Sequence, residues 1–139
     1  MDTTTCTRPD AAAERTLWPV AGLLLDALTR RDFDAMLDCL APDVRFRALV
    51  PPGAFELTTA GETIARFRRW FDGPDDFEVV DASVGRVGAK TYLRWQLRLR
   101  PADGPARVVE QHAYTTGTEL IETLDLLCSG FHTDTEAAR

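Results

Sequence analysis

Hydrophobic residues recur at helical spacing in three stretches of the first half of the chain. The apolar positions fall three and four residues apart, which places them on one face of a helix. This pattern predicts helices over residues 18–29, 32–40 and 61–71. Asp32 stands at the start of the second helix, where its carboxylate can accept hydrogen bonds from the first backbone N–H groups. Pro42 prevents that helix from continuing.

Elsewhere apolar and polar residues alternate singly, which is the period of a strand with one buried face. The alternation predicts strands over residues 43–49, 54–59, 77–87, 91–100, 107–115 and 119–129. The strand at 91–100 has a polar row on its outer face made of Arg94, Gln96, Arg98 and Arg100. Three helices and long antiparallel strands predict an α+β domain. We expect a strongly curved, mostly antiparallel sheet packed on the helices, forming a cone with an internal pocket.

The chain of 139 residues is short enough for one domain, which we place at residues 16–132 between polar tails at 1–15 and 133–139. The first fifteen residues lack the apolar segment of a signal peptide. The longest apolar run, at residues 20–25, is too short to span a bilayer. We therefore expect a cytoplasmic protein without a membrane partner.

Charge and cysteine content exclude further classes of function. The net charge of −6 argues against nucleic-acid binding, which needs clustered basic residues. The three cysteines, Cys6, Cys39 and Cys128, are odd in number and widely spaced, so neither a disulfide framework nor a zinc site is expected. Two distant histidines do not supply the ligands that a metal needs, and no metal is predicted.

The last two long strands contain most of the candidate catalytic residues. With a two-residue turn, even positions of the first strand oppose odd positions of the second, so Glu110, His112 and Tyr114 share a face with Thr123 and Asp125. A carboxylate beside an imidazole is suited to moving protons, and an apolar pocket shifts both pKa values toward neutrality. The same residues also fit a structural pair on a wetted outer face.

Three segments carry a resemblance to a known family: RDFDAMLDCLAPDVRF (31–46), AGETIARFRRWF (60–71) and LIETLDLL (120–127). They resemble the SnoaL-like branch of the nuclear transport factor 2-like superfamily, a cystatin-like α+β cone that includes polyketide cyclases and ketosteroid isomerase. On this match Asp125 takes the place of the general acid/base aspartate of the cyclases. His112 takes the place of the histidine that supports it, and Leu124 stands where the family often has tryptophan.

The isomerase relatives imply a different set of positions. Their general-base aspartate corresponds to Ala48, their oxyanion-hole tyrosine to Leu24 and their second acid to Glu110. Only the last of these three positions still carries a residue of the same chemical type. Isomerase chemistry of that type is therefore not expected. The limonene-epoxide-hydrolase type of relative uses an Asp–Arg–Asp relay, and Val108 stands where its arginine is sought.

The leading hypothesis is a cofactor-independent acid/base enzyme that acts on a small, largely apolar carbonyl compound by aldol-type cyclisation or isomerisation. Its predicted catalytic residues are Asp125 and His112, and its predicted substrate-binding residues are Glu110, Tyr114, Phe46, Ala48, Leu24 and Trp95. The alternative is a non-catalytic module that binds a small ligand or dimerises. A homodimer through the outer sheet face is expected. An enzyme requires Glu110, His112 and Asp125 to line a closed apolar cavity, whereas a module leaves them in solvent or under a partner chain.

Overall fold

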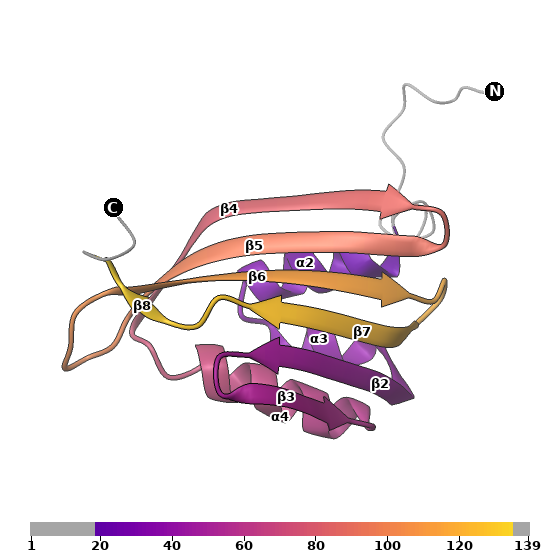
Figure 1. The fold of residues 1–139 in the computed structure, drawn as a ribbon, viewed down its shortest axis with the longest axis horizontal. Coiled ribbons are helices and arrows are strands. Elements are labelled where there is room, and N and C mark those ends of the chain that lie inside the picture. The colour runs from indigo at the N-terminus through magenta and orange to yellow at the C-terminus, as the bar shows by residue number, and fades with distance from the viewer. Residues whose placement is uncertain (1–18, 135–139) are drawn as a thin grey trace.

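The computed structural model describes residues 19–134, in which three helices lie on one face of an unclosed seven-stranded sheet (Figure 1). The helices are α2 (Val20–Thr29), α3 (Phe33–Asp38) and α4 (Ala60–Phe71). This confirms the predicted α+β class. The first predicted helix was expected to begin at Trp18, which lies outside the described residues, as do the predicted tail at 1–15 and most of the tail at 133–139.

The sheet is mostly antiparallel, as predicted. Its strands are β2 (Leu40–Val50), β3 (Gly53–Leu57), β4 (Asp76–Val87), β5 (Lys90–Arg100), β6 (Arg107–Thr116), β7 (Ile121–Cys128) and β8 (His132–Thr133). Their order is β3-β2-β7-β6-β5-β4, with β8 paired to β6. Strands β2 and β7 run parallel, which brings the first and last long strands together in the middle of the sheet. The two-residue β8 was not predicted, because two residues are too few to show alternation.

The first strand begins three residues earlier than its alternation predicts. Leu40 pairs with Ile121 in the parallel ladder, and the Ile121 N–H donates to the Cys39 carbonyl at 2.8 Å. These long-range bonds extend β2 back to the end of α3. The neighbouring strand is shorter than expected and ends at Leu57, because Thr59 serves as the N-cap of α4.

Side-chain caps define where α3 and α4 begin. The Asp32 carboxylate accepts a hydrogen bond from the Ala35 N–H at 3.1 Å, as the sequence predicts. The Thr59 hydroxyl accepts from the Glu62 N–H at 3.1 Å, while the Glu62 side chain lies 3.1 Å from the same hydroxyl. A Thr and a Glu three residues apart are typical of a helix start.

Arg31 ties the junction of α2 and α3 to the end of α4. Its backbone has a φ of 52°, a left-handed conformation that is uncommon outside glycine. Its guanidinium donates to the carbonyls of Phe71 at 3.2 Å and Pro74 at 2.8 Å, and lies over the ring of Phe77. These contacts stabilise the unusual backbone conformation and link the α2–α3 junction to the C-terminal end of α4.

The core lies between the helices and the inner face of the sheet. The inner face of β5 contributes four buried side chains, which are Leu93, Trp95, Leu97 and Leu99. Phe67 of α4 stacks on Phe46 of β2 with ring centroids 5.6 Å apart, and it also touches the rings of Trp70, Phe71 and Trp95. None of the helices between residues 19 and 134 is long and apolar enough to cross a membrane.

The position of Phe67 predicts a large effect on stability. Phe67→Ala should lower the free energy of unfolding by about 3–5 kcal/mol, because it removes a buried ring and leaves a cavity among its aromatic neighbours. Urea unfolding followed by circular dichroism measures the change. The exposed Glu122→Ala on β7 is the control and should shift stability by less than about 0.5 kcal/mol. A small loss for Phe67→Ala would contradict the central place given to this ring.

Candidate functional site

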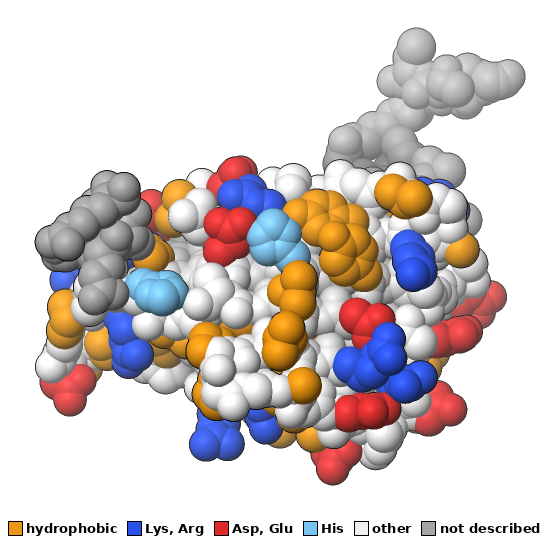
Figure 2. Space-filling view, viewed as in Figure 1, with side chains coloured by type: hydrophobic (Ala, Val, Ile, Leu, Met, Phe, Trp, Pro, Cys, Tyr) orange, Lys and Arg blue, Asp and Glu red, His pale blue; other side chains and the backbone are white. Residues whose placement is uncertain are grey.

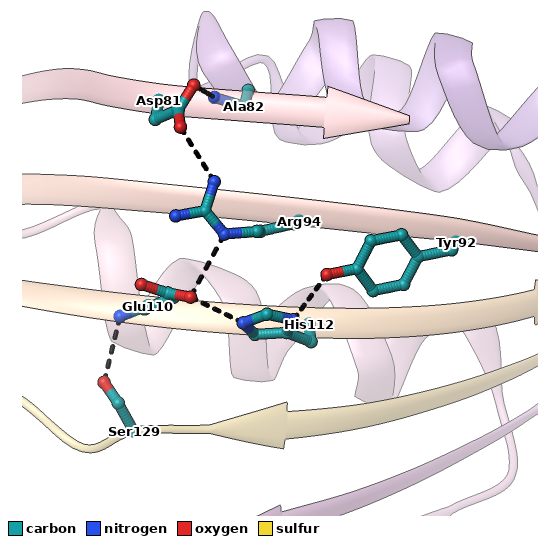
Figure 3. Close-up of polar contacts among 7 residues, drawn as sticks. All are labelled: Asp81, Ala82, Tyr92, Arg94, Glu110, His112 and Ser129. Atoms are coloured by element: carbon teal, nitrogen blue, oxygen red, sulfur yellow. Dashed lines mark hydrogen bonds and ion pairs between the residues drawn. The ribbon is translucent and has the colours of Figure 1, made fainter. Parts of the chain in front are cut away.

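A chain of polar contacts crosses the outer face of the sheet, which is the face turned away from the helices (Figure 3). Glu110 of β6 accepts a hydrogen bond from the Arg94 Nε at 3.1 Å, and its Oε2 lies 2.6 Å from the His112 Nε2. The His112 Nδ1 lies 2.6 Å from the Tyr92 hydroxyl. Arg94 continues the chain to Asp81 of β4 at 2.8 Å. Three adjacent strands are thus linked through side chains.

Strand register explains how these side chains meet. Arg94 stands opposite His112 in the β5–β6 ladder, and Glu110 lies two residues away on the same face. Side chains that are opposite or diagonal in an antiparallel pair are close enough to interact. The Glu110 backbone is held as well, since its N–H donates to the Ser129 hydroxyl at 2.9 Å (Figure 3).

The contacts keep the carboxylates of this network ionised. Hydrogen bonds from His112 and Arg94 hold the pKa of Glu110 below its usual value. The hydrogen bond from Arg94 lowers the pKa of Asp81 in the same way. Both ring nitrogens of His112 are occupied, so the ring can form a hydrogen bond to a further molecule only by releasing Tyr92 or Glu110.

Asp125 belongs to a separate ion pair on the same outer face. The Nε and Nη2 of Arg47 donate to its two carboxylate oxygens at 2.7 Å each, in the two-pronged geometry that arginine forms with carboxylates. The hydrogen bond from Arg47 lowers the pKa of Asp125. A general acid/base works best with a pKa near the working pH, and this pairing shifts the pKa of Asp125 away from it.

An open apolar groove lies beside this ion pair. It has a volume of about 740 Å³ and is lined by residues of the neighbouring strands β3, β2, β7 and β6. Three large apolar side chains on this face are unusually accessible, with exposed fractions of 52% for Leu49, 45% for Tyr114 and 50% for Leu127. Figure 2 looks onto this face and shows apolar side chains beside charged ones. A clustered apolar surface of this kind is typical of a binding interface.

The inner face has a different chemistry. The predicted substrate-binding residues Leu24, Phe46, Ala48 and Trp95 are all buried there. The Trp95 indole N–H donates to Oε1 of the wholly buried Gln111 at 2.8 Å, and the Gln111 amide donates to the Cys128 sulfur at 3.3 Å. Among residues 19–134, no fully buried side chain is an acid or a histidine.

The candidate residues therefore divide between two faces. The predicted sharing of one face by Glu110, His112, Tyr114 and Asp125 is confirmed, and Tyr114 stands directly opposite Asp125 in the ladder. The catalytic hypothesis requires Glu110, His112 and Asp125 to line a closed apolar cavity. These residues instead lie on the outer face, and the sheet separates them from the predicted substrate-binding residues Phe46, Ala48, Leu24 and Trp95. Whether any of these residues is catalytic or binds substrate stays a prediction.

Sequence reasoning missed the partners of the acids. Arg94 and Arg47 were visible as outer-face positions, and Tyr92 lies on the same polar row. Their pairing with particular acids depends on the strand neighbours β5–β6 and β2–β7, and the second of these pairs joins segments 78 residues apart. The alternation alone contains no signal for that contact.

The described residues contain no cluster of side chains that is suited to binding a metal ion. Between residues 19 and 134, no three side chains of His, Cys, Asp or Glu are grouped closely enough to hold a metal ion. Cys39 and Cys128 are free thiols, and burial raises the pKa of Cys39 to about 11, which keeps it protonated.

A second cavity opens at the end of the sheet where β2 and β7 finish. It has a volume of about 500 Å³ and lies between α4, the β2–β3 turn and the segment after β7. In Figure 1 the arrowheads of β2 and β7 lie side by side at this end. This cavity, and not the outer network, is next to the core.

Comparison with solved structures identifies the same architecture in other proteins. A nuclear transport factor 2-like protein from Burkholderia thailandensis has a TM-score of 0.65 at 15% identity, covering 79% of this chain and 88% of that one. A proposed polyketide cyclase from Xanthomonas campestris has a TM-score of 0.63 at 19% identity, covering 78% and 86%. A proposed ketosteroid isomerase from Kribbella flavida has a TM-score of 0.58 at 17% identity, covering 80% and 76%. At these identities the likeness shows the fold alone.

The sequence itself also has a family match. No curated protein matches the chain. The model of the SnoaL-like domain matches residues 22–121, which is most of the chain and spans the three helices and strands β2 to β6, ending at the first residue of β7. The chain therefore belongs to the SnoaL-like domain family.

Proposed function

We propose that this SnoaL-like domain binds a small, largely apolar molecule in the cavity next to its core and associates as a homodimer through its outer sheet face. The observation that supports this function best is the separation of the two faces. Acids and histidine lie outside in satisfied contacts, and the side chains around the core are apolar apart from a few neutral groups. The walls of the cavity are mostly apolar, with two arginines on α4, and such walls are suited to binding by burial of apolar surface.

The homodimer is supported by the apolar part of the outer face. Leu49 and Leu127 lie on the adjacent strands β2 and β7, paired in register, and Tyr114 stands on β6 beyond them. A second copy can cover this patch with the same patch, as two-fold dimers do. The neighbouring charges are already paired within the chain, so covering them leaves no carboxylate without a partner.

Acid/base catalysis on a carbonyl compound is the second candidate function, and the hydrogen-bonded series Tyr92–His112–Glu110 favours it. An ionised Glu110 orients the ring, and the ring can exchange a proton with the Tyr92 hydroxyl. The structural neighbours that share the fold include proteins named as a polyketide cyclase and a ketosteroid isomerase, and these names support chemistry of this kind. In this chain the series lies on an open surface, where water weakens such electrostatic effects.

The homodimer predicts a change of assembly on substitution. Leu127→Glu should convert the dimer into a monomer, because it brings an unpaired charge into the apolar patch. Sedimentation velocity measures the mass in solution. Leu37→Glu is the matched control, since Leu37 is also an exposed leucine but lies on α3, and it should leave the dimer intact. A wild-type protein that sediments as a single chain would rule the homodimer out.

The catalytic alternative has its own test. An acid/base enzyme that uses the predicted pair should lose a factor of about 10²–10⁴ in turnover with Asp125→Asn or His112→Gln. The assay is proton exchange at the acidic carbon of a small 1,3-dicarbonyl compound in D₂O, followed by NMR. The ligand-binding function instead predicts that the wild-type protein does not accelerate exchange at all. Acceleration that both variants abolish would favour catalysis.

The ionised state of Glu110 predicts how stability depends on pH. Because His112 and Arg94 lower its folded-state pKa, Glu110 stabilises the fold above its unfolded pKa, and this contribution is lost as pH falls through the folded value. The loss of stability in Glu110→Gln should therefore be largest above about pH 5 and should shrink toward about pH 3. Urea unfolding at several pH values measures it. Glu122→Gln is the control, because Glu122 is exposed and has no ion pair between residues 19 and 134, and this variant should cost little stability.

A further inference from the structure

We propose that the cavity at the end of β2 and β7 takes a ligand with a flat apolar body and an anionic oxygen group such as a carboxylate. This rests on the proposed ligand-binding function and names the class of ligand. The cavity volume of about 500 Å³ is within the roughly 300–1,000 Å³ that is usual for small-molecule sites. Helix α4 lines one side of it with Arg66, Arg69 and Trp70.

The arginines around this cavity differ from the others in the part of the chain that the structure describes. Most arginines between residues 19 and 134 form an ion pair with a carboxylate, and Arg31 and Arg86 donate to backbone carbonyls instead. Arg66, Arg69 and Arg107 have neither kind of partner among those residues. The first two line the cavity, and Arg107 lines a smaller hollow that adjoins it. In a chain with a net charge of −6, unpaired cations at one site favour an anion there.

Helical spacing directs two of these arginines to the cavity. Arg66, Arg69 and Trp70 stand at i, i+3 and i+4 and so share one face of α4. Arg68 points elsewhere and pairs with Asp34 at 3.2 Å. Cations near the C-terminal end of a helix are stabilised by the helix dipole, which explains the basic residues Arg68 and Arg69 in the last turn of α4. The dipole does not explain why Arg66 and Arg69, on the cavity side, lack a carboxylate partner between residues 19 and 134 while Arg68 has one.

Arg66 is held in position before any ligand arrives. Its guanidinium carbon lies 4.0 Å from the centre of the Phe55 ring, a favourable cation–π distance. The side chain is partly buried, and its N–H groups donate to no residue between 19 and 134. A planar guanidinium with free donors matches the two oxygens of a carboxylate. A group that is ordered in advance loses less entropy on binding.

The remaining walls are apolar and fit a flat molecule. They are formed by Trp70 and by residues on two loops, namely Val50, Pro51, Pro52, Cys128, Gly130 and Phe131. Gly130 has a φ of +87°, and a Cβ there would lie 2.7 Å from a ring carbon of Pro51. Glycine therefore allows the segment after β7 to close against the β2–β3 turn. The Cys128 sulfur accepts hydrogen bonds from the Gln111 amide and from the Gly130 N–H, so these donors are already paired within the protein.

The smaller hollow extends the site toward a third cation. Its volume is about 190 Å³, and it shares Arg69, Trp70 and Phe131 with the main cavity before reaching Arg107. The shared residues place an arginine and two aromatic rings at the junction. A ligand whose ring lies against Trp70 and Phe131 can thus direct its oxyanion to Arg69 and to either of the other two arginines.

The test compares two probes of the same shape on the full chain by isothermal titration calorimetry. The probes are 2-naphthoate, which carries the carboxylate, and 2-naphthamide, which is neutral. We expect naphthoate to bind about tenfold more tightly, because arginine–carboxylate hydrogen bonds are charge-assisted. Arg66→Gln and Arg69→Gln should each weaken naphthoate binding several-fold, and the double variant should remove the preference, with naphthamide affinity unchanged. The control Arg86→Gln removes the same charge on β4 and should change neither affinity.

The outcomes separate this proposal from the function on which it rests. Equal affinity for the two probes would contradict the proposal that the ligand is anionic, but it would be consistent with the ligand-binding function. Failure of both probes to bind would contradict the ligand-binding function as well. If inorganic phosphate displaced the probe as well as naphthoate does, the site would bind any anion, and the proposal that the ligand has an apolar body would be wrong. Amide chemical-shift changes on naphthoate binding should cluster at Val50, Trp70 and Phe131, and changes confined to Leu49, Tyr114 and Leu127 would place binding in the outer groove and overturn the site.

Discussion

The packing of Phe67 against the inner face of the sheet is the contact on which the rest of the structure depends. Its ring joins α4 to β2 and β5 through Phe46 and Trp95, and two further aromatic rings surround it. Large rings bury more apolar area than any other side chains, so this cluster dominates the core. The cluster fills the centre of the cone, and a cavity next to the core opens toward the end of the sheet, where Trp70 and Phe131 form part of the wall.

The same packing decides what each face of the sheet can do. Strand residues alternate between the faces, so a strand that turns Gln111 and Ala113 inward must turn Glu110 and His112 outward. Charged groups placed against the aromatic core would lose hydration without a partner, which is costly. On the outer face each acid of the network finds an arginine or a histidine from a neighbouring strand. The inner face is thereby suited to apolar contact and the outer face to polar networks and association.

The SnoaL-like fold accommodates different activities because its sites depend on single side chains at a few positions. The resemblance to the isomerases implies that their base and tyrosine correspond to Ala48 and Leu24 here, and both of these residues are buried in the core. Two arginines on α4 and one at the start of β6 pair with no carboxylate between residues 19 and 134, and they line the cavity and the hollow beside it. The family thus establishes the scaffold, and the charge distribution of this chain suggests the type of ligand.

Periodicity and capping signals were enough to predict the three helices, the cap at Asp32, the long strands and the alternation of strand residues between two faces. These features depend on neighbours within a few residues. The sequence did not determine which face of β6 and β7 the helices cover, because both faces of these two strands carry apolar and polar residues. The parallel pairing of β2 with β7, the ion pair of Arg47 with Asp125 and the cavity beside α4 also required the tertiary structure. Each joins segments that are distant in sequence, and only the folded chain decides which of them meet.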